Sequence, residues 1–240
     1  MSYHNGPKIV NDGLVLYLDA ANSKSYSGTG TTWTDLSGNS NNATLVNGPT
    51  YSSLNGGGIV LDATDDFISI TPSVSLKVDA GNFTILSVHK IGTAFDTYGQ
   101  FFYQSGDGSG AATNKSIFFQ RNGANTINLD FYGNGSSFNF GTNSFAANTL
   151  VFIAVSFNKV ALTSIYFRNG VFSSAQTHTG SPSFTNLSSV QIGKRYDTTA
   201  GFSAKDLDGT NYITMIYNRD LNSAEILQNY NALRGRFGLW

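Results

Sequence analysis

The sequence of 240 residues contains a single glutamate, Glu225, and no cysteine. The absence of cysteine excludes disulfide bonds, a thiol nucleophile and a thiolate metal site. The scarcity of glutamate weighs against a sugar-cleaving enzyme, because such enzymes need two placed carboxylates, usually with at least one glutamate. The composition therefore favours a rigid protein that binds or assembles over one that catalyses a reaction.

Charge is also scarce, at 12% of residues, which is about half of the roughly 25% found in typical domains. The net charge is −1, so there is no basic field to attract nucleic acid, and we expect no nucleic-acid partner. No apolar run approaches the ~18 residues that a membrane span requires, and we expect no membrane partner. Residues 1–8 contain no apolar segment, so we expect no secretory signal.

What the sequence does contain is a series of short apolar and aromatic runs separated by turn residues. Hydrophobic residues make up 40% of the chain, which is enough for a sizeable core. The pattern predicts an all-β fold, a sandwich or a jelly roll. The strand-like runs lie at 14–18, 58–61, 67–70, 83–89, 100–103, 116–119, 126–132, 150–157, 164–168, 171–172, 189–192 and 212–217.

These runs give three more detailed predictions. Asn169-Gly170 lies between two runs, which is a strong local signal for a two-residue hairpin. Alternation in 126–132 places Ile127, Leu129 and Phe131 on one face of a strand. The run 83–89 is apolar on both faces, which predicts a central position in its sheet.

One short helix is predicted near the C-terminus. Asn222 followed three residues later by Glu225 is a capping-box pattern. After it, four apolar residues fall on one helical face, and Gly235 is the predicted end. The sole glutamate therefore has a structural explanation. The four apolar residues are Ile226, Tyr230, Leu233 and Phe237.

Several segments together resemble a known family: 12–19, 30–39, 41–44, 62–68, 216–226 and 229–237. They are similar to the laminin-G-like, concanavalin A-like jelly roll family, and especially to its stand-alone members among the structural proteins of tailed bacteriophages. The resemblance runs from Gly13 to Leu239, so we expect an N-terminal arm (residues 1–12) followed by one domain (residues 13–240). It implies an all-β, two-sheet antiparallel jelly roll sandwich, often with one calcium ion at a rim, and often with loops that bind glycans or proteins. The glucanase branch uses a Glu-x-Asp-x-Glu motif, which a single glutamate cannot supply.

Three aspartate segments are candidates for a calcium site. Asp62, Asp65 and Asp66 gather within five residues of a predicted hairpin, and calcium takes about six to eight oxygen ligands, several of them carboxylate. The alternative is turn chemistry, in which aspartate accepts hydrogen bonds from its own backbone. The segment 206–209 resembles part of a calcium loop but lacks its distal glutamate. The segment 35–39 is the third candidate, with an ordinary Asx turn as its alternative.

Trp33 and Tyr26 are the candidate glycan-binding residues. They lie in a stretch rich in Gly, Thr and Ser, and an exposed tryptophan ring can stack on the C–H face of a sugar. The alternative is that Trp33 fills the edge of the sandwich core. His89 lies in an apolar strand, where a structural role is the expected one.

The sequence thus predicts a non-catalytic structural protein of a bacteriophage particle, a capsid decoration or head fibre located in the virion. Its expected partners are phage capsid or tail proteins, with cell-surface glycans and a homo-oligomer also considered. The alternative is a carbohydrate-binding lectin or a tail receptor-binding module. An enzyme is the third reading, and it would require an Asp–Asp pair.

Overall fold

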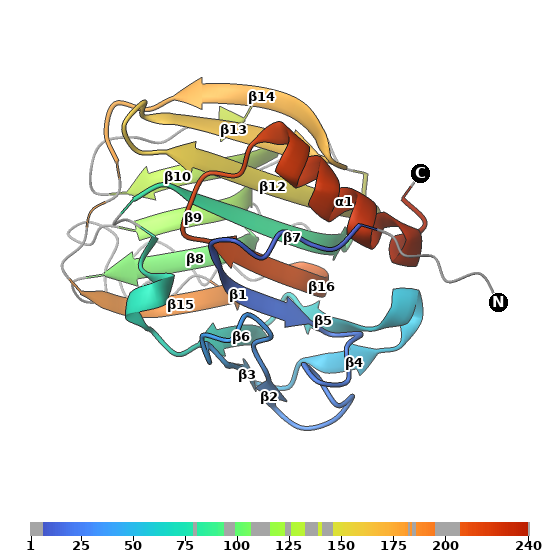
Figure 1. Ribbon diagram of the computed structural model, residues 1–240. Helices are drawn as coiled ribbons and strands as arrows, with labels where there is room; N and C mark the ends of the chain where they lie inside the picture. The colour runs from blue at the N-terminus through green and yellow to red at the C-terminus, as the bar shows by residue number, and fades with distance from the viewer. Residues whose placement is uncertain are drawn as a thin grey trace.

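The computed structural model describes residues 7–78, 81–93, 99–106, 116–122, 126–132, 139–140, 146–181, 183, 186–194 and 207–239. Within these ranges the chain forms two eight-stranded antiparallel sheets, packed face to face, and one α-helix (Figure 1). The predicted all-β jelly roll sandwich with one C-terminal helix is confirmed. No helix in these ranges has the length and apolar character needed to cross a bilayer.

The first sheet, sheet A, has the strand order β14-β13-β12-β7-β16-β5-β4, and β1 also pairs with β16. Strand β16 is long enough to pair along one side with β5 through residues 208–211 and with β1 through residues 213–217. As predicted, β7 is central, between β12 and β16. The bounds are β1 Leu14–Asp19, β4 Thr50–Ser52, β5 Gly58–Asp62, β7 Phe83–Ile91, β12 Leu150–Asn158, β13 Thr163–Arg168, β14 Val171–Thr177 and β16 Asp208–Tyr217.

The predicted hairpin joins β13 to β14. Its two central residues, Asn169 and Gly170, have φ of 48° and 77°, and positive φ at both positions is what a type I′ turn requires. Gly170 also lies against Tyr230, because a Cβ at Gly170 would come within 2.7 Å of that ring. This turn therefore needs glycine for its backbone and for its contact with the helix.

The second sheet, sheet B, has the strand order β11-β10-β9-β8-β15-β6-β3-β2. Two short 3-10 helices, η1 and η2, lie in the connections. The bounds are β2 Thr32–Trp33, β3 Ala43–Val46, η1 Leu54–Gly56, β6 Phe67–Ile70, η2 Val74–Leu76, β8 Gln100–Gly106, β9 Ser116–Asn122, β10 Thr126–Tyr132, β11 Asn139–Phe140 and β15 Leu187–Gly193.

The main core fills the space between the sheets. Ile127, Leu129 and Phe131 of β10 all face it, as the alternation predicts. The opposite face of sheet A is buried as well, because Leu86 and Val88 of β7 belong to a second cluster beneath the helix. A strand covered on both faces explains why the run 83–89 carries apolar residues on both faces.

Helix α1, Ser223–Phe237, lies across the outer face of sheet A, over β12, β7 and β16 (Figure 1). The capping box is confirmed: Asn222 accepts from the Glu225 amide, and Glu225 accepts from the Asn222 amide. The predicted end at Gly235 is wrong, because the helix continues to Phe237 and its left-handed C-cap is Gly238. The extra turn places Phe237, 7% exposed, in the cluster under the helix.

The described part of the predicted arm, residues 7–12, runs along α1. The Val10 amide donates to Asn229 Oδ1 over 2.8 Å, and the Val10 carbonyl accepts from the Tyr217 hydroxyl over 2.9 Å. Gln228 Nε2 also donates to the Lys8 carbonyl. This segment is therefore fastened to the domain at two points along the helix.

Candidate functional site

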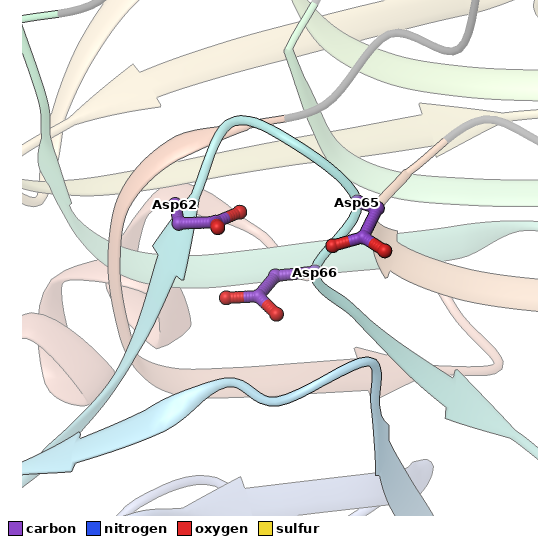
Figure 2. A group of neighbouring side chains, drawn as sticks. All are labelled: Asp62, Asp65 and Asp66. Carbon is purple, nitrogen blue, oxygen red and sulfur yellow. The ribbon is translucent and has the colours of Figure 1, made fainter.

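The three predicted calcium ligands converge in the hairpin between β5 and β6 (Figure 2). Asp62 ends β5, and Asp65 and Asp66 precede β6. One carboxylate oxygen from each lies within 4.8 Å of the other two. Asp62 also performs the turn chemistry given as the alternative, because its Oδ1 accepts from the Thr64 amide over 2.8 Å. The arrangement thus serves the turn and gathers three acidic groups.

The pKa values of Asp62 and Asp66 reflect their surroundings in this cluster of three carboxylates. Backbone amides, above all that of Thr64, lower the pKa of Asp62. Burial and then the neighbouring Asp62 carboxylate raise the pKa of Asp66. Mutual repulsion of this kind is relieved by a bound cation. Carboxylate oxygens are the donors that calcium prefers, so the chemistry of the donor set fits that ion, and Asp62, Asp65 and Asp66 are the residues that could contribute to holding it.

The other two aspartate candidates do not join this cluster. Asp35, 8% exposed, accepts four hydrogen bonds from Tyr17, Ser37 and Asn41. Its carboxylate is therefore used to fix the loop, as an Asx turn does. Asp208 lies opposite Asp62 in the ladder between β16 and β5, but its carboxylate is not among the three that gather. Asp206 lies outside the described residues.

The predicted sugar-stacking residues are buried. Trp33 is 0% exposed and Tyr26 is 4% exposed, and their rings meet edge to face at 6.4 Å. Both belong to the core between the sheets. The expectation that they present a ring face to a glycan is therefore wrong, and the alternative reading of Trp33 as a core residue is confirmed. A large aromatic side chain buried here contributes to packing instead.

The structure reveals a different surface feature, on the outer face of sheet B between β6 and β15. Two hollows follow one another along these strands. The first has a volume of about 380 Å³, and its described lining is Ser69, Ile70, Pro72, Ser188, Ser189, Val190 and Gln191. The second has a volume of about 270 Å³ and is lined by Pro72, Ser73, Val74, Lys77, Asn186 and Leu187. We call the two together the β6–β15 furrow.

Gln191 is the most informative residue of the furrow. It pairs with Ser69 of β6 and Tyr103 of β8, so the three side chains share the outer face of sheet B. Gln191 is 7% exposed, and its Oε1 has no hydrogen-bond partner among the described residues. A buried amide oxygen without a donor is costly, and this oxygen is enclosed and not open to the hollow.

Further polar and aromatic groups continue this face beyond the furrow. Gln100 Nε2 donates to Gln120 Oε1 over 2.6 Å, and Gln120 Nε2 donates to Asp130 Oδ2. Tyr103 and Phe118 stack with their ring centroids 5.2 Å apart. All five side chains are buried, at 0–5% exposed, so they pack this face and, like Trp33 and Tyr26, are not available to a glycan.

Comparisons with known proteins agree with the two-sheet fold. Residues 62–227 match the family model described as the concanavalin A-like lectin/glucanases superfamily. The match covers more than half of the chain, and the structure shows that residues 14–62 complete both sheets. A comparison with curated protein sequences found no match.

Similar solved structures include Trypanosoma rangeli sialidase in complex with sialic acid, with a TM-score of 0.65 at 16% identity over 92% of this chain. The binding domain of paraclostridial mosquitocidal protein 1 has a TM-score of 0.67 at 14% identity over 92% of this chain. The binding domain of botulinum neurotoxin DC, in complex with SialylT, has a TM-score of 0.65 at 13% identity over 93% of this chain. This chain spans 33% of the sialidase chain and 52% of each toxin chain. At such identities the likeness shows the fold alone.

The two-sheet sandwich, its closing helix and the matched family model lead to one assignment: the chain belongs to the concanavalin A-like lectin/glucanases superfamily.

Proposed function

We propose that this protein is a non-catalytic carbohydrate-binding module that holds a glycan in the β6–β15 furrow. The observation that carries the proposal is a hollow of about 380 Å³ on the outer face of sheet B, whose described lining combines Gln191 with three serines. Ligand pockets of proteins have volumes of about 300–1,000 Å³ and place a few polar groups at defined positions. Lectin-type members of the superfamily, and the glycan-bound neighbours above, support the same reading.

The proposal that the protein is non-catalytic rests on the role of its single glutamate, Glu225. Glu225 accepts from the Asn222 amide and receives two hydrogen bonds from the Arg219 guanidinium, at 2.6 and 3.0 Å. The Arg219 hydrogen bonds hold the pKa of Glu225 below its usual value. This residue is therefore an ionised structural group, unsuited to donate a proton as a glycosidase acid must.

Glycan binding is tested by a glycan array followed by calorimetry with the strongest ligand. We expect Gln191→Ala to weaken binding by about threefold to tenfold, the value of one neutral hydrogen bond. The matched control is Gln176→Ala on the edge strand β14, which leaves affinity unchanged. Failure of the protein to bind any glycan, with or without calcium, contradicts the proposal. Release of reducing sugar by the purified protein contradicts its non-catalytic part.

We also propose calcium as the ion of the Asp62, Asp65 and Asp66 cluster. A ligand that binds only the folded state stabilises it by about 2.7 kcal/mol at a hundredfold excess over its Kd, so we expect calcium to raise the Tm by several degrees. Chelator should reverse the shift. Asp65→Asn should abolish it, whereas Asp12→Asn, at an exposed position outside the cluster, should keep it. An equal Tm in calcium and chelator contradicts the site.

The setting that we propose for this module is the bacteriophage particle, as a capsid decoration or head fibre that meets host-surface glycans. The support is the resemblance of residues 13–239 to stand-alone structural proteins of tailed phages. Cryo-electron microscopy of particles with and without the protein tests this setting. Identical density in the two preparations counts against the phage setting. The glycan-binding proposal does not depend on this result, because the glycan array tests it separately.

A further inference from the structure

Three Asn-Gly steps lie wholly within the described residues, beginning at Asn47, Asn55 and Asn169. In such a step the amide nitrogen of the glycine can attack the side-chain carboxamide of the asparagine, and ammonia is lost. Glycine favours this cyclisation because it has no side chain to restrict the backbone. All three asparagines have a positive φ, between 48° and 69°. The steps therefore share one local chemistry, and the surrounding fold decides how readily each reacts.

The fold restrains two of the three steps. The Asn169 amide donates to the Phe152 carbonyl over 2.8 Å, its Oδ1 accepts from the Phe152 amide over 3.1 Å, and the glycine that follows is buried. Asn55 Nδ2 donates to the Tyr212 hydroxyl over 3.0 Å, and a Cβ at the glycine after it would lie 3.2 Å from Arg236 Cδ. Cyclisation must move both residues of a step, so contacts on both oppose it.

The step between Asn47 and Gly48, directly after β3, has fewer restraints. Both residues are exposed, and the Gly48 amide donates no hydrogen bond within the part of the chain that the structure describes. A Cβ at Gly48 would meet a single atom within 4 Å, Asp66 Oδ1 at 3.9 Å, so the chain has room to turn here. The Asn47 side chain is held by the hydrogen bond from Nδ2 to the Asp65 carbonyl, over 3.0 Å.

We propose that Asn47 is a site of deamidation, and that the carboxylate formed there adds its charge to the cluster of Asp62, Asp65 and Asp66. Hydroxide removes the proton of the Gly48 amide, and the nitrogen attacks Asn47 Cγ. The new C–N bond closes a succinimide ring, the bond from Cγ to Nδ2 breaks, and ammonia leaves after Nδ2 takes a proton from water. A second water molecule opens the ring at either carbonyl and yields aspartate or isoaspartate. The Asp65 carbonyl thereby loses its donor, and a negative charge replaces it.

The experiment incubates native and guanidinium-unfolded protein side by side in mildly alkaline buffer, and peptide mapping by mass spectrometry follows each asparagine. The unfolded chain is the control, because there the three steps differ only in their flanking residues. Relative to that control, we expect Asn47 to react in the native protein at least about tenfold faster than Asn169, which must first break two hydrogen bonds. Asn55 should also react more slowly than Asn47. Equal protection of the three steps, faster reaction at Asn55 or Asn169, or no reaction at Asn47 in the native protein overturns the proposal.

The effect of the new charge is tested with Asn47→Asp and its uncharged control Asn47→Gly, which both remove the donor to the Asp65 carbonyl and both tolerate a positive φ. At 1 M salt the Debye length is about 3 Å, so repulsion from the neighbouring carboxylates is screened. In chelator we expect this salt to raise the Tm of Asn47→Asp by about 1–3 °C more than that of Asn47→Gly. Chelator keeps the comparison independent of the calcium proposal. Equal responses of the two variants to salt overturn the coupling to the cluster.

Discussion

Trp33→Ala should lower the free energy of unfolding by about 3–5 kcal/mol, the cost of truncating a large buried aromatic side chain. Trp33 is 0% exposed, and the deletion leaves a cavity beside Tyr26 that the rigid sheets close only in part. Urea denaturation followed by far-UV circular dichroism measures the change. Trp33→Phe retains a ring and should cost less than half as much. A surface platform for sugars would show the opposite behaviour, with full stability and lost binding.

Fluorescence checks the same assignment without disturbing the core. The chain has two tryptophans, so in the Trp240→Phe variant all emission comes from Trp33. We expect blue-shifted emission, poor quenching by acrylamide, and no change when a glycan that binds the wild type is added. Strong quenching in the folded variant contradicts the buried position.

Acid should destabilise the protein already at pH values well above those at which carboxylates titrate. His89 is 0% exposed, and burial lowers its pKa from 6.5 to about 3. Its Nδ1 lies 2.7 Å from Ser87 Oγ. Because the Ser87 hydroxyl also donates to the Ile213 carbonyl, Nδ1 carries the proton of a neutral ring. Between pH 6.5 and 3 the unfolded chain therefore binds the extra proton, and stability falls as the pH falls.

The slope is about 1.4 kcal/mol per pH unit for one such histidine, so His89 should remove about 2 kcal/mol between pH 7 and pH 5. His178 acts in the same direction, because burial lowers its pKa to about 4. Urea unfolding at the two pH values measures the loss. His89→Gln should reduce the loss of unfolding free energy between pH 7 and pH 5 by about half, whatever the substitution itself costs at pH 7. His178→Gln should remove much of the remaining loss. A free energy of unfolding equal at both pH values would contradict the buried neutral state.

Local patterns predicted those parts of the fold that depend on neighbours in the sequence. The alternation in 126–132, the Asn169-Gly170 turn and the capping box at Asn222 each involve residues a few positions apart, and each is confirmed. The end of the helix was missed because glycine alone does not stop a helix. A Cβ at Gly235 would meet nothing within 4 Å, and burial of Phe237 favours the extra turn.

The site was harder to predict, for a physical reason. The acidic cluster lies within five residues and was visible in the sequence, whereas the furrow joins β6 to β15, which are more than a hundred residues apart. Ser189 and Gln191 alternate with the core residues Val190 and Ile192 on β15, and this is a local signal of a polar outer face. Which strands lie side by side is decided by the whole sandwich. Trp33 was misplaced because the small polar residues around it resemble an exposed loop.

The position of β16 has a consequence for biosynthesis. This strand pairs with β1, β5 and β7, so until residues 208–217 have left the ribosome β1 lacks this partner, and β5 and β7 are each paired on one side only, with β4 and β12. Contacts that join such distant parts of a chain also form slowly. The nascent polypeptide must therefore remain open and chaperone-accessible through most of its translation, and the sandwich closes as a late, nearly all-or-none event.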